Sequence, residues 1–294
     1  MDTVLRSRSK TVTIGAEQPF CIIGERINPT GRKAFAEELR AGDLSSAEAD
    51  ALAQVAAGAD MLDVNAGIPL VDEADLLARM LGVVQAAVDA PICIDSSVIE
   101  ALEAGLSVYE GRALVNSVTA EDDRLEVVLP LVAKHDAAVI GLTNDETGIP
   151  MTAEERLQHA RKIVSAAQDY GIKPDDVVID PLAMPVGADT GAVAETLRAM
   201  RMIRDELGVN MCCGASNVSF GLPERVALNA AFLPMAMAAG LTSAIMSTAG
   251  ACVSSVRAAD LLLGHDEWGA SWIAAHRARV AAEKEAAERE VAAS

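Results

Sequence analysis

Ile92-Cys93-Ile94-Asp95 is a short apolar run that ends in a carboxylate, and this pattern recurs along the chain. Such a run is long enough for a buried parallel strand, and helix-like segments separate most of the copies. Because the carboxyl ends of parallel strands meet on one face of an α/β structure, the polar side chains there are expected to build one site. The runs that share the pattern are residues 20–28, 61–65, 92–97, 113–117, 177–181 and 211–217.

Eight strand-like segments alternate with helix-like segments, which predicts a single-domain (β/α)8 TIM barrel of the α/β class. An open doubly wound sheet is the alternative, but no GxGxxG, GxxxxGKS or GxxxxGKT motif follows any of the strands. The strands are expected at residues 20–24, 60–64, 91–94, 112–115, 137–142, 176–179, 209–213 and 243–246.

The expected organisation is a loose amino-terminal extension at residues 1–19, a barrel at residues 20–264 and a helical tail at residues 265–294. Capping-box patterns at residues 45–48 and 152–155 predict the starts of two helices. The tail is rich in Ala, Glu, Arg and Lys, with charged pairs near i,i+4 spacing. Either it is a surface helix that frays at its end, or it docks on a second subunit in a homodimer.

Composition excludes several classes of protein. The chain has 294 residues, 51% of them hydrophobic, which suits one large domain with a sizeable core. The formal net charge of -19 argues against a nucleic-acid surface, which needs clustered Lys and Arg. Residues 1–13 lack the apolar segment of a secretory signal, and no apolar run reaches the roughly 18–20 residues of a membrane helix. A cytoplasmic protein with no nucleic-acid or membrane partner is expected.

The cysteines are interpreted as reduced core residues, because their number is odd and their settings are strand-like. Adjacent Cys212 and Cys213 suggest a zinc site as an alternative, but neighbouring side chains on a strand point to opposite faces. No CxxC motif occurs elsewhere, and the four histidines lie in helix-like segments, so no bound metal is expected. The five cysteines are Cys21, Cys93, Cys212, Cys213 and Cys252.

The side chains at the strand ends are mostly Asp and Asn, a set that suits a flat, nitrogen-rich heterocycle better than a phosphate. An ionised Asp accepts hydrogen bonds from two donors, whereas Asn donates and accepts at once. A single Asp or Asn at a strand end has a simpler interpretation as a helix cap or turn former. On that interpretation Asp95 caps the next helix and Asp180 forms a turn. Convergence of several such residues at one barrel mouth favours a binding site.

Eight strand-end segments, taken in order, resemble those of the pterin-binding methyltransferases that pass a methyl group from methyltetrahydrofolate to a corrinoid protein. The resemblance covers about residues 20–263 and extends to the folate domain of cobalamin-dependent methionine synthase and, more distantly, to dihydropteroate synthase. Each segment is weakly specific alone, and their order on one barrel pattern is specific. They are residues 23–28 (IGERIN), 63–65 (DVN), 95–96 (DS), 116–117 (NS), 140–143 (IGLT), 147–150 (TGIP), 179–182 (IDPL) and 216–219 (SNVS).

The resemblance implies roles for the positions that match the family's motifs. It places Asp95, Asn116 and Asp180 in hydrogen bonds with the pterin ring. It places Asn217 near the methyl-bearing nitrogen, where the amide supports catalysis, and it implies a folate contact for Arg225.

Further positions in the matching motifs complete the predicted folate-binding set, namely Glu25, Asn28, Asp63 and Asn65. One position departs from the family pattern, because Phe220 stands where the family has a Gln. This departure puts a polar contact near the folate in doubt.

The resemblance also implies tetrahydrofolate or 5-methyltetrahydrofolate as substrate and a corrinoid supplied by a partner protein, because no corrinoid-binding DxHxxG segment is present. The sequence leaves the direction of methyl transfer undetermined. Two other functions stay open, a dihydropteroate synthase-like enzyme and a non-catalytic folate-binding subunit of a methyl-transfer complex. The synthase needs an anion site with Lys or Arg at late strand ends, and residues 214–217 and 247–250 contain neither.

Overall fold

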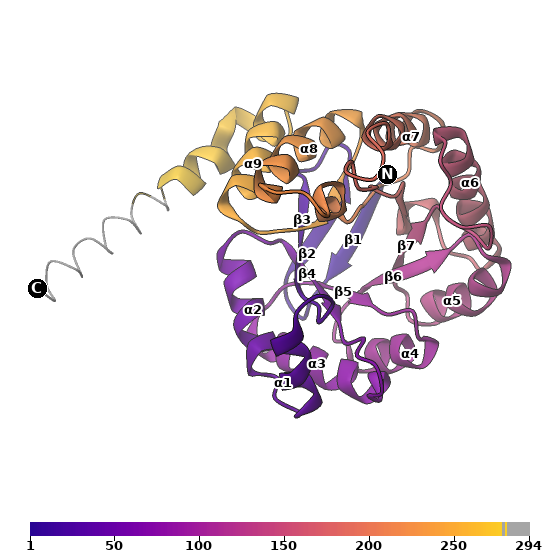
Figure 1. The fold of residues 1–294 in the computed structure, drawn as a ribbon, viewed down its shortest axis with the longest axis vertical. Coiled ribbons are helices and arrows are strands. Elements are labelled where there is room, and N and C mark those ends of the chain that lie inside the picture. The colour runs from indigo at the N-terminus through magenta and orange to yellow at the C-terminus, as the bar shows by residue number, and fades with distance from the viewer. Residues whose placement is uncertain (278–279, 281–294) are drawn as a thin grey trace, which may run out of the picture.

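The computed structural model describes residues 1–277 and residue 280. A ring of helices surrounds a central set of strands (Figure 1). The strands are β1 (Asp2–Arg6), β2 (Thr11–Gly15), β3 (Cys21–Ile27), β4 (Met61–Asn65), β5 (Ile92–Asp95), β6 (Leu114–Thr119), β7 (Ala138–Leu142), β8 (Val177–Asp180) and β9 (Ser243–Met246). The α-helices are α1 (Lys33–Arg40), α2 (Ser45–Ala56), α3 (Glu73–Ala87), α4 (Ile99–Val108), α5 (Asp122–Lys134), α6 (Ala153–Asp169), α7 (Ala192–Leu207), α8 (Arg225–Ala239) and α9 (Gly250–Leu263). Short 3-10 helices are η1 (Pro174–Asp176), η2 (Ala215–Ser219) and η3 (Glu267–Gly269).

The parallel strands close into a barrel, as the sequence predicts. The sheet runs in the order β8-β7-β6-β5-β4-β3-β9, and residues 210–214 close the gap between β8 and β9. Hydrogen bonds from Cys212 N to Ile179 O and from Ile245 N to Cys213 O, each 3.0 Å long, complete the ring. The strand predicted at residues 209–213 is therefore reduced to isolated bridges, because Met211 O accepts backbone bonds from residues 242 and 243 instead of continuing a regular ladder.

Alternation along each strand decides which side chains the barrel encloses. Cys93 points inward into an apolar cluster with Ile23 and Met61, whereas Ile92 and Ile94 pack against the surrounding helices. The next inward positions belong to the polar residues at the strand ends. The barrel interior is therefore an apolar floor with a polar layer above it at the carboxyl ends.

The five cysteines are buried free thiols, as the sequence predicts. Cys212 belongs to the inner cluster and Cys213 to the outer one, as expected for neighbours on an extended strand. Burial raises the pKa of Cys212 to about 12, so this thiol is uncharged at neutral pH.

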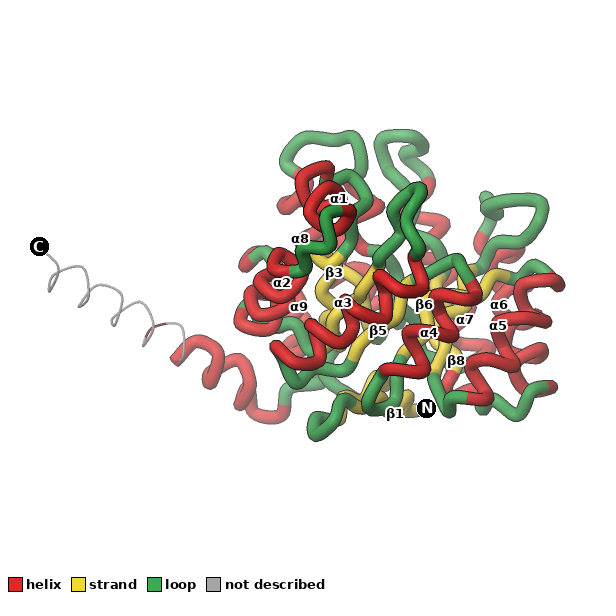
Figure 2. The backbone as a smooth tube through the Cα atoms, turned by 90° about the horizontal axis from the view of Figure 1, so that it is seen from below, coloured by secondary structure: helices red, strands yellow, loops and turns green. Residues whose placement is uncertain are grey.

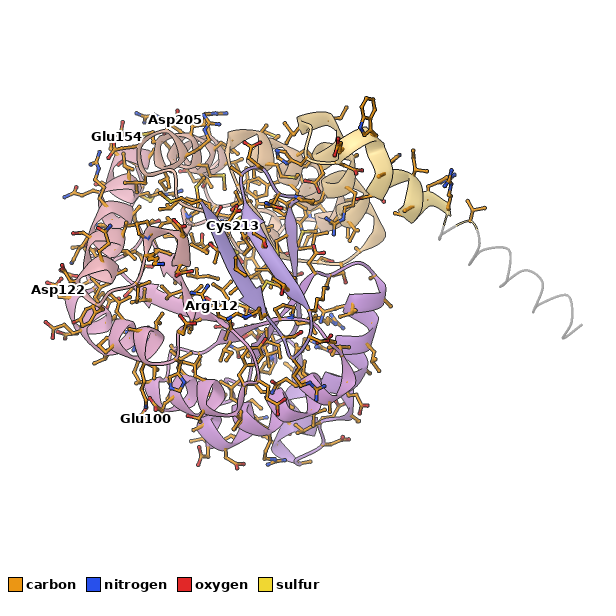
Figure 3. All side chains as sticks on the ribbon, turned by 180° about the vertical axis from the view of Figure 1, so that it is seen from behind. Glu100, Arg112, Asp122, Glu154, Asp205 and Cys213 are labelled. Atoms are coloured by element: carbon orange, nitrogen blue, oxygen red, sulfur yellow. The ribbon has the colours of Figure 1, made fainter. Side chains whose placement is uncertain are left out.

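The amino-terminal residues form an ordered plug, so the prediction of a loose start was wrong. Strands β1 and β2 pair as an antiparallel hairpin that lies at the end of the barrel opposite the long loops (Figures 2 and 3). Leu5 and Ile14 are fully buried and join the inner apolar cluster. Asn210 Nδ2 donates to Thr3 Oγ1 (2.9 Å) and Ile14 O (2.8 Å), and Arg112 Nη1 donates to a hairpin carbonyl. The sequence did not predict these two strands, because only alternate side chains of the hairpin face the barrel and most of the others are polar.

Two predicted capping boxes have different outcomes. Thr152 accepts from Glu155 N, and the Glu155 side chain bonds the Thr152 backbone, so the capping box of α6 is confirmed. Helix α2 starts at Ser45 without a side-chain cap, because Asp43 Oδ1 instead accepts from Ser45 N at 2.9 Å. The capping-box prediction at residues 45–48 was therefore wrong, although the helix it predicted is present.

The predicted tail begins with η3 and is helical at residues 270–277, and its residues 278–279 and 281–294 lie outside the described part of the chain. Within the part of the chain described, no helix is long and apolar enough to cross a membrane.

Candidate functional site

The polar residues at the strand ends lie in one row across neighbouring strands. Asn65, Asp95 and Asn116 are paired in register on β4, β5 and β6. Asp180 ends β8 and is paired with Leu142 of β7. The parallel register thus brings side chains that are more than 100 residues apart in the sequence to one barrel mouth, as the sequence analysis expects.

Two carboxyl groups share the centre of this mouth. Asp63 is 2% exposed and accepts a hydrogen bond from Asn116 Nδ2 at 3.1 Å, and Asp95 accepts one from Asn65 Nδ2 at 2.9 Å. Burial, and then repulsion by Asp95, raises the pKa of Asp63 well above its ordinary value. Burial also raises the pKa of Asp95, to about 6. Burial thus favours the neutral form of the Asp63 carboxyl, and the Asn116 and Asn65 amides each donate to one member of the pair.

Asp180 is the second acceptor at the mouth. Its Oδ1 accepts from Leu182 N at 2.7 Å, so the turn predicted at Asp180 is present. Burial raises the pKa of the Asp180 carboxyl to about 7, although the Leu182 amide, Arg156 and the Gly214 amide each oppose that rise. A carboxylate has about four lone-pair sites, so a turn bond leaves capacity for ligand donors.

Glu25 lies on the β3 side of the mouth. Ser216 Oγ donates to Glu25 Oε1 at 2.9 Å, and Asn229 Nδ2 donates to Ser216 Oγ at 3.3 Å. Burial raises the pKa of Glu25. Asn229 Oδ1 is buried and has no hydrogen-bond partner among the residues that the structure describes. A cavity of about 380 Å³ adjoins Glu25 and is lined also by Ser247 and Thr248.

Asn217 lies on the exposed turn of η2, beside the end of the barrel-closing segment. A Cβ atom at Gly214 would come within 2.9 Å of Asn217 Nδ2, so glycine at this position leaves room for the amide. Arg225 holds the same turn, because its Nη2 donates to Ser216 O (2.8 Å) and its Nε to Ser219 Oγ (3.1 Å). Arg225 therefore positions η2 as well as being a predicted folate contact.

Phe220 is 67% exposed next to this turn, with the Arg225 guanidinium 6.0 Å from its ring centroid. The Asn28 side chain serves a local turn instead of contacting the carboxylates, because its Oδ1 accepts from Thr30 N at 2.9 Å. Asn65 combines both roles, since its Oδ1 accepts from Gly67 N while its Nδ2 reaches Asp95.

The sequence analysis assigned no role to two further polar residues at this end, Ser96, which lies in a matching segment, and Arg156. Ser96 donates to the Glu73 carboxylate at the start of α3, and Ser96 N donates to Asn116 O at 2.9 Å. Arg156 is buried behind Asp180. Arg156 occupies the apolar face of α6 with Leu157 and Ala160, and a lone charge in such a stripe is a signal that could have identified it.

The arrangement provides hydrogen-bond acceptors at two separated points, Asp95 and Asp180, with the Asn116 amide between them. This set matches a planar ring with several N–H donors better than an anion. The described residues contain no group of three or more His, Cys, Asp or Glu side chains placed to hold a metal ion. A second hollow, of about 450 Å³, lies at the hairpin end of the barrel and is lined by Arg6 and Arg112, far from these acceptors.

Comparison of the sequence with known proteins identifies a family and several relatives. The family described as pterin binding enzyme matches residues 24–247. A methylcorrinoid:tetrahydrofolate methyltransferase of Eubacterium limosum is 34% identical over 252 residues, which cover 83% of this chain and 92% of that protein. The methionine synthase of Mycobacterium leprae (strain TN) is 34% identical over 248 residues, which cover 79% of this chain and 20% of that protein.

Solved structures show the same fold at lower sequence identity. Dihydropteroate synthase from Xanthomonas albilineans in complex with 7,8-dihydropteroate superimposes with a TM-score of 0.69 at 19% identity, covering 88% of this chain and 98% of that one. The 7,8-dihydropteroate synthase of Vibrio fischeri ES114 gives a TM-score of 0.69 at 16% identity. The family match over residues 24–247 and the 34% identity across most of both chains show that this protein belongs to the pterin-binding enzyme family.

Proposed function

We propose that this protein is a methyltransferase that moves a methyl group between 5-methyltetrahydrofolate and the cobalt of a corrinoid on a partner protein. The observation that carries the proposal is the 34% identity to the E. limosum methylcorrinoid:tetrahydrofolate methyltransferase over 92% of that protein. The dihydropteroate synthases share the fold at 19% identity or less in the two structures compared above, which supports no activity.

The barrel mouth supplies what a reduced pterin needs. The aminopyrimidinone edge of a pterin carries adjacent N–H donors, which ionised Asp180 and Asp95 are placed to accept. The Asn116 amide nitrogen is engaged by Asp63, so its amide oxygen is left for a ligand donor. Because these hydrogen bonds are buried, a ring that leaves one of the carboxylates without a donor binds much more weakly than a pterin.

Asn217 is proposed as the residue that acts on the methyl-bearing nitrogen. This tertiary amine is a poor leaving group, so stabilisation is needed as its bond to the methyl group breaks. A neutral amide donor preorganised on η2 supplies that stabilisation without moving. The corrinoid of the partner supplies the cobalt that exchanges the methyl group. Asn217 is exposed, so the reacting nitrogen would lie on the side open to the partner.

The remaining assignments belong to the same proposal. The protein acts in the cytoplasm as a homodimer, with a corrinoid protein as its partner and no resident metal. Glu25, Asp63, Asn65 and Arg225 support the folate site, either by direct contact or by holding the residues that touch the ring. Asn28 is the weakest member of this predicted set, because its side chain serves a local turn.

Calorimetry with methyltetrahydrofolate, followed by methyl transfer to free reduced cobalamin and from methylcobalamin to tetrahydrofolate, tests the function in both directions. We expect folate binding and turnover. Asn217→Ala should lower turnover by roughly ten- to a thousandfold while folate affinity changes less, as for removal of one preorganised donor. Asn217→Gly, which keeps the turn and deletes the amide, should behave in the same way.

Three outcomes count against the proposal. Absence of folate binding overturns it. Binding without turnover in either direction supports the non-catalytic subunit instead. Full activity of Asn217→Gly refutes the catalytic assignment of the amide while leaving the function in place.

A further inference from the structure

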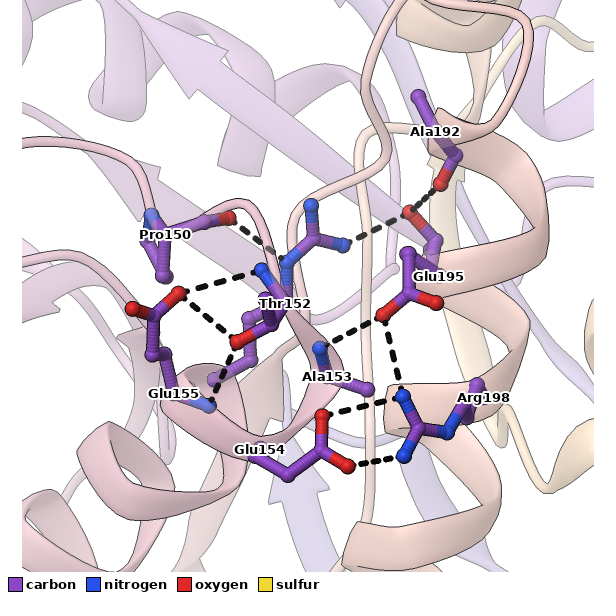
Figure 4. Close-up of polar contacts among 10 residues, drawn as sticks. Pro150, Thr152, Ala153, Glu154, Glu155, Ala192, Glu195 and Arg198 are labelled. Carbon is purple, nitrogen blue, oxygen red and sulfur yellow. Dashed lines mark hydrogen bonds and ion pairs between the residues drawn. The ribbon is translucent and has the colours of Figure 1, made fainter.

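Arg156 is a buried cation that makes no ion pair within the described part of the chain. Its residue exposure is 1%, and its guanidinium donates to Pro150 O (3.2 Å, from Nε), Pro181 O (3.0 Å), Leu182 O (3.1 Å) and Thr196 Oγ1 (2.8 Å). Burying a charge without a paired opposite charge is costly. Three carbonyls and a hydroxyl satisfy its hydrogen bonds but leave its charge uncompensated. The surrounding contacts between α6 and α7 can be followed in Figure 4.

Two of the three carbonyls that Arg156 binds, those of Pro181 and Leu182, belong to the turn that follows Asp180. Leu182 has a left-handed backbone, with φ at 62°, and its N–H donates to Asp180 Oδ1 at 2.7 Å. Thr196 Oγ1 also donates to Leu182 O (3.1 Å), so α6 and α7 hold this turn from the same side. With the carbonyls held by Arg156, the Leu182 N–H is directed at the carboxylate. Arg156 thereby fixes the carboxylate through the turn without touching it.

Charge gives Arg156 a second effect on Asp180. The carboxylates whose charges act on Arg156 are Glu195 and Asp180. Glu195 is already engaged, because its Oε2 accepts from Ala153 N (2.9 Å) and lies 3.5 Å from Arg198 Nη1. Asp180 is therefore the natural counter-charge for the buried guanidinium when the carboxyl is ionised.

We propose that Arg156 is a positioning residue that orients the Asp180 carboxylate for the pterin and favours its ionised form. The inference rests on the proposed folate site and adds to it a residue that the ligand does not contact. Burial favours the neutral carboxyl, and Arg156 opposes it, so ligand binding should strengthen as pH rises through the pKa of Asp180 near 7. The groups that act on Asp180 or feel its charge are the Leu182 and Gly214 amides, the Arg156 guanidinium, and the Cys212 and Cys213 thiols.

Two substitutions separate the charge of Arg156 from its position. Arg156→Gln keeps a donor for the carbonyls and removes the charge, whereas Arg156→Lys keeps the charge and loses the planar fork. Folate affinity is measured by calorimetry between about pH 5.5 and 9. We expect the midpoint of the pH dependence to rise by about one unit in R156Q, because the ionised carboxylate loses its counter-charge. R156K should bind more weakly with a midpoint near that of the wild type.

Arg161→Met is the matched control, because Arg161 joins α6 to α7 through an exposed pair with Glu206 and leaves both Glu195 and the Asp180 turn unchanged. Its midpoint should equal that of the wild type. A folded R156Q protein with a wild-type midpoint overturns the charge effect. A folate affinity of R156K equal to that of the wild type overturns the positioning effect. This measurement is still possible if R156Q does not fold. Absence of binding in the wild type is a different failure, that of the proposed function.

Discussion

Burial acts on the carboxyl groups of the mouth to different extents. Asp63 is 2% exposed and accepts from the Asn116 amide, and burial raises its pKa well above the ordinary value. Asp95, with a pKa of about 6, is mostly ionised at neutral pH, whereas Asp180, with a pKa of about 7, is about half ionised there. The sequence identifies all of them as polar residues near strand ends, but only the structure shows how deeply each carboxyl is buried and therefore how far its pKa is raised.

Asp180→Asn should stabilise the ligand-free protein at alkaline pH. The folded pKa of about 7 lies above the unfolded value near 3.8, so wild-type stability is lost as pH rises from about 4 to 7 and the loss persists above that range. The amide is never ionised and escapes this loss. The gain in Tm should be larger at about pH 8 than at about pH 5.5, with roughly 2–4 °C expected for each kcal/mol.

Asp89→Asn supplies the control of opposite sign. Ser7 and Ser9 hydrogen bonds lower the pKa of the exposed Asp89 carboxyl, so its contribution is present above the unfolded pKa and is lost as pH falls through the lowered value. This variant should be less stable than the wild type at about pH 8. Equal Tm changes for Asp180→Asn at both pH values would contradict a raised pKa, and unchanged folate affinity would contradict its role as an acceptor.

At the scale of elements, the loops that follow the strands divide into anchored turns and exposed tips. The β8–α7 turn is held by buried hydrogen bonds, whereas other loops on the site side present apolar side chains to solvent. These tips are Leu70 between β4 and α3, Ile149 and Met151 between β7 and α6, and Phe220 between η2 and α8. Long loops extend from this end of the molecule in Figure 2. Exposed apolar groups around a site suit a protein surface that must cover it.

Leu70→Ser and Phe220→Ser should therefore weaken methyl exchange with a corrinoid protein more than exchange with free cobalamin. Loss of one buried apolar contact corresponds to about three- to tenfold in apparent affinity for the protein partner. Leu262→Ser is the control, because Leu262 is 85% exposed near the carboxyl end of α9, away from the mouth. Equal losses with both acceptors would show that the tips serve folate or folding instead of the partner.

The elements also show where sequence pattern suffices. Alternation of apolar runs with helical segments predicts the barrel, because both periodicities are set by burial. The same pattern does not predict the hairpin, which has few apolar positions. It also predicts a regular strand at residues 209–213, where the structure has isolated bridges, because strand regularity depends on the neighbouring strands. Asp95, Asn116 and Asp180 are predictable as strand-end residues. The lone charge of Arg156 on the apolar face of α6 marks it as unusual, but its role is not predictable, because most of its partners are backbone carbonyls, which no side-chain motif records.

At the scale of the whole molecule, the two ends of the barrel differ: a hairpin covers one end, and polar side chains line the other. The hairpin covers the amino-terminal ends of the strands, and the acceptors line the carboxyl ends. The apolar floor between them contains Ile23, Met61 and Leu114. Stability and ligand binding should therefore respond to substitutions at different ends.

Leu5→Ala tests this separation. Leu5 is fully buried in the inner cluster, so its truncation should lower the free energy of unfolding by about 2–5 kcal/mol, as measured by urea denaturation. Folate affinity of the folded variant should equal that of the wild type, because the site lies at the opposite end. Val12→Ala, at a partly buried hairpin position, should cost less. A loss of folate affinity with little loss of stability would contradict the division.

The hairpin is synthesised long before the residues that bury it. Residues 1–15 precede every barrel strand on the ribosome, yet Thr3 receives its bond from Asn210, a separation of 207 residues. At roughly 5–20 residues per second, translation of the intervening chain takes on the order of 10–40 s. Throughout that interval the inner apolar cluster against which Leu5 and Ile14 pack is incomplete. A segment made before the barrel strands is thus among the last to be buried, so the growing chain exposes an apolar hairpin that a chaperone can bind until residues 209–213 emerge.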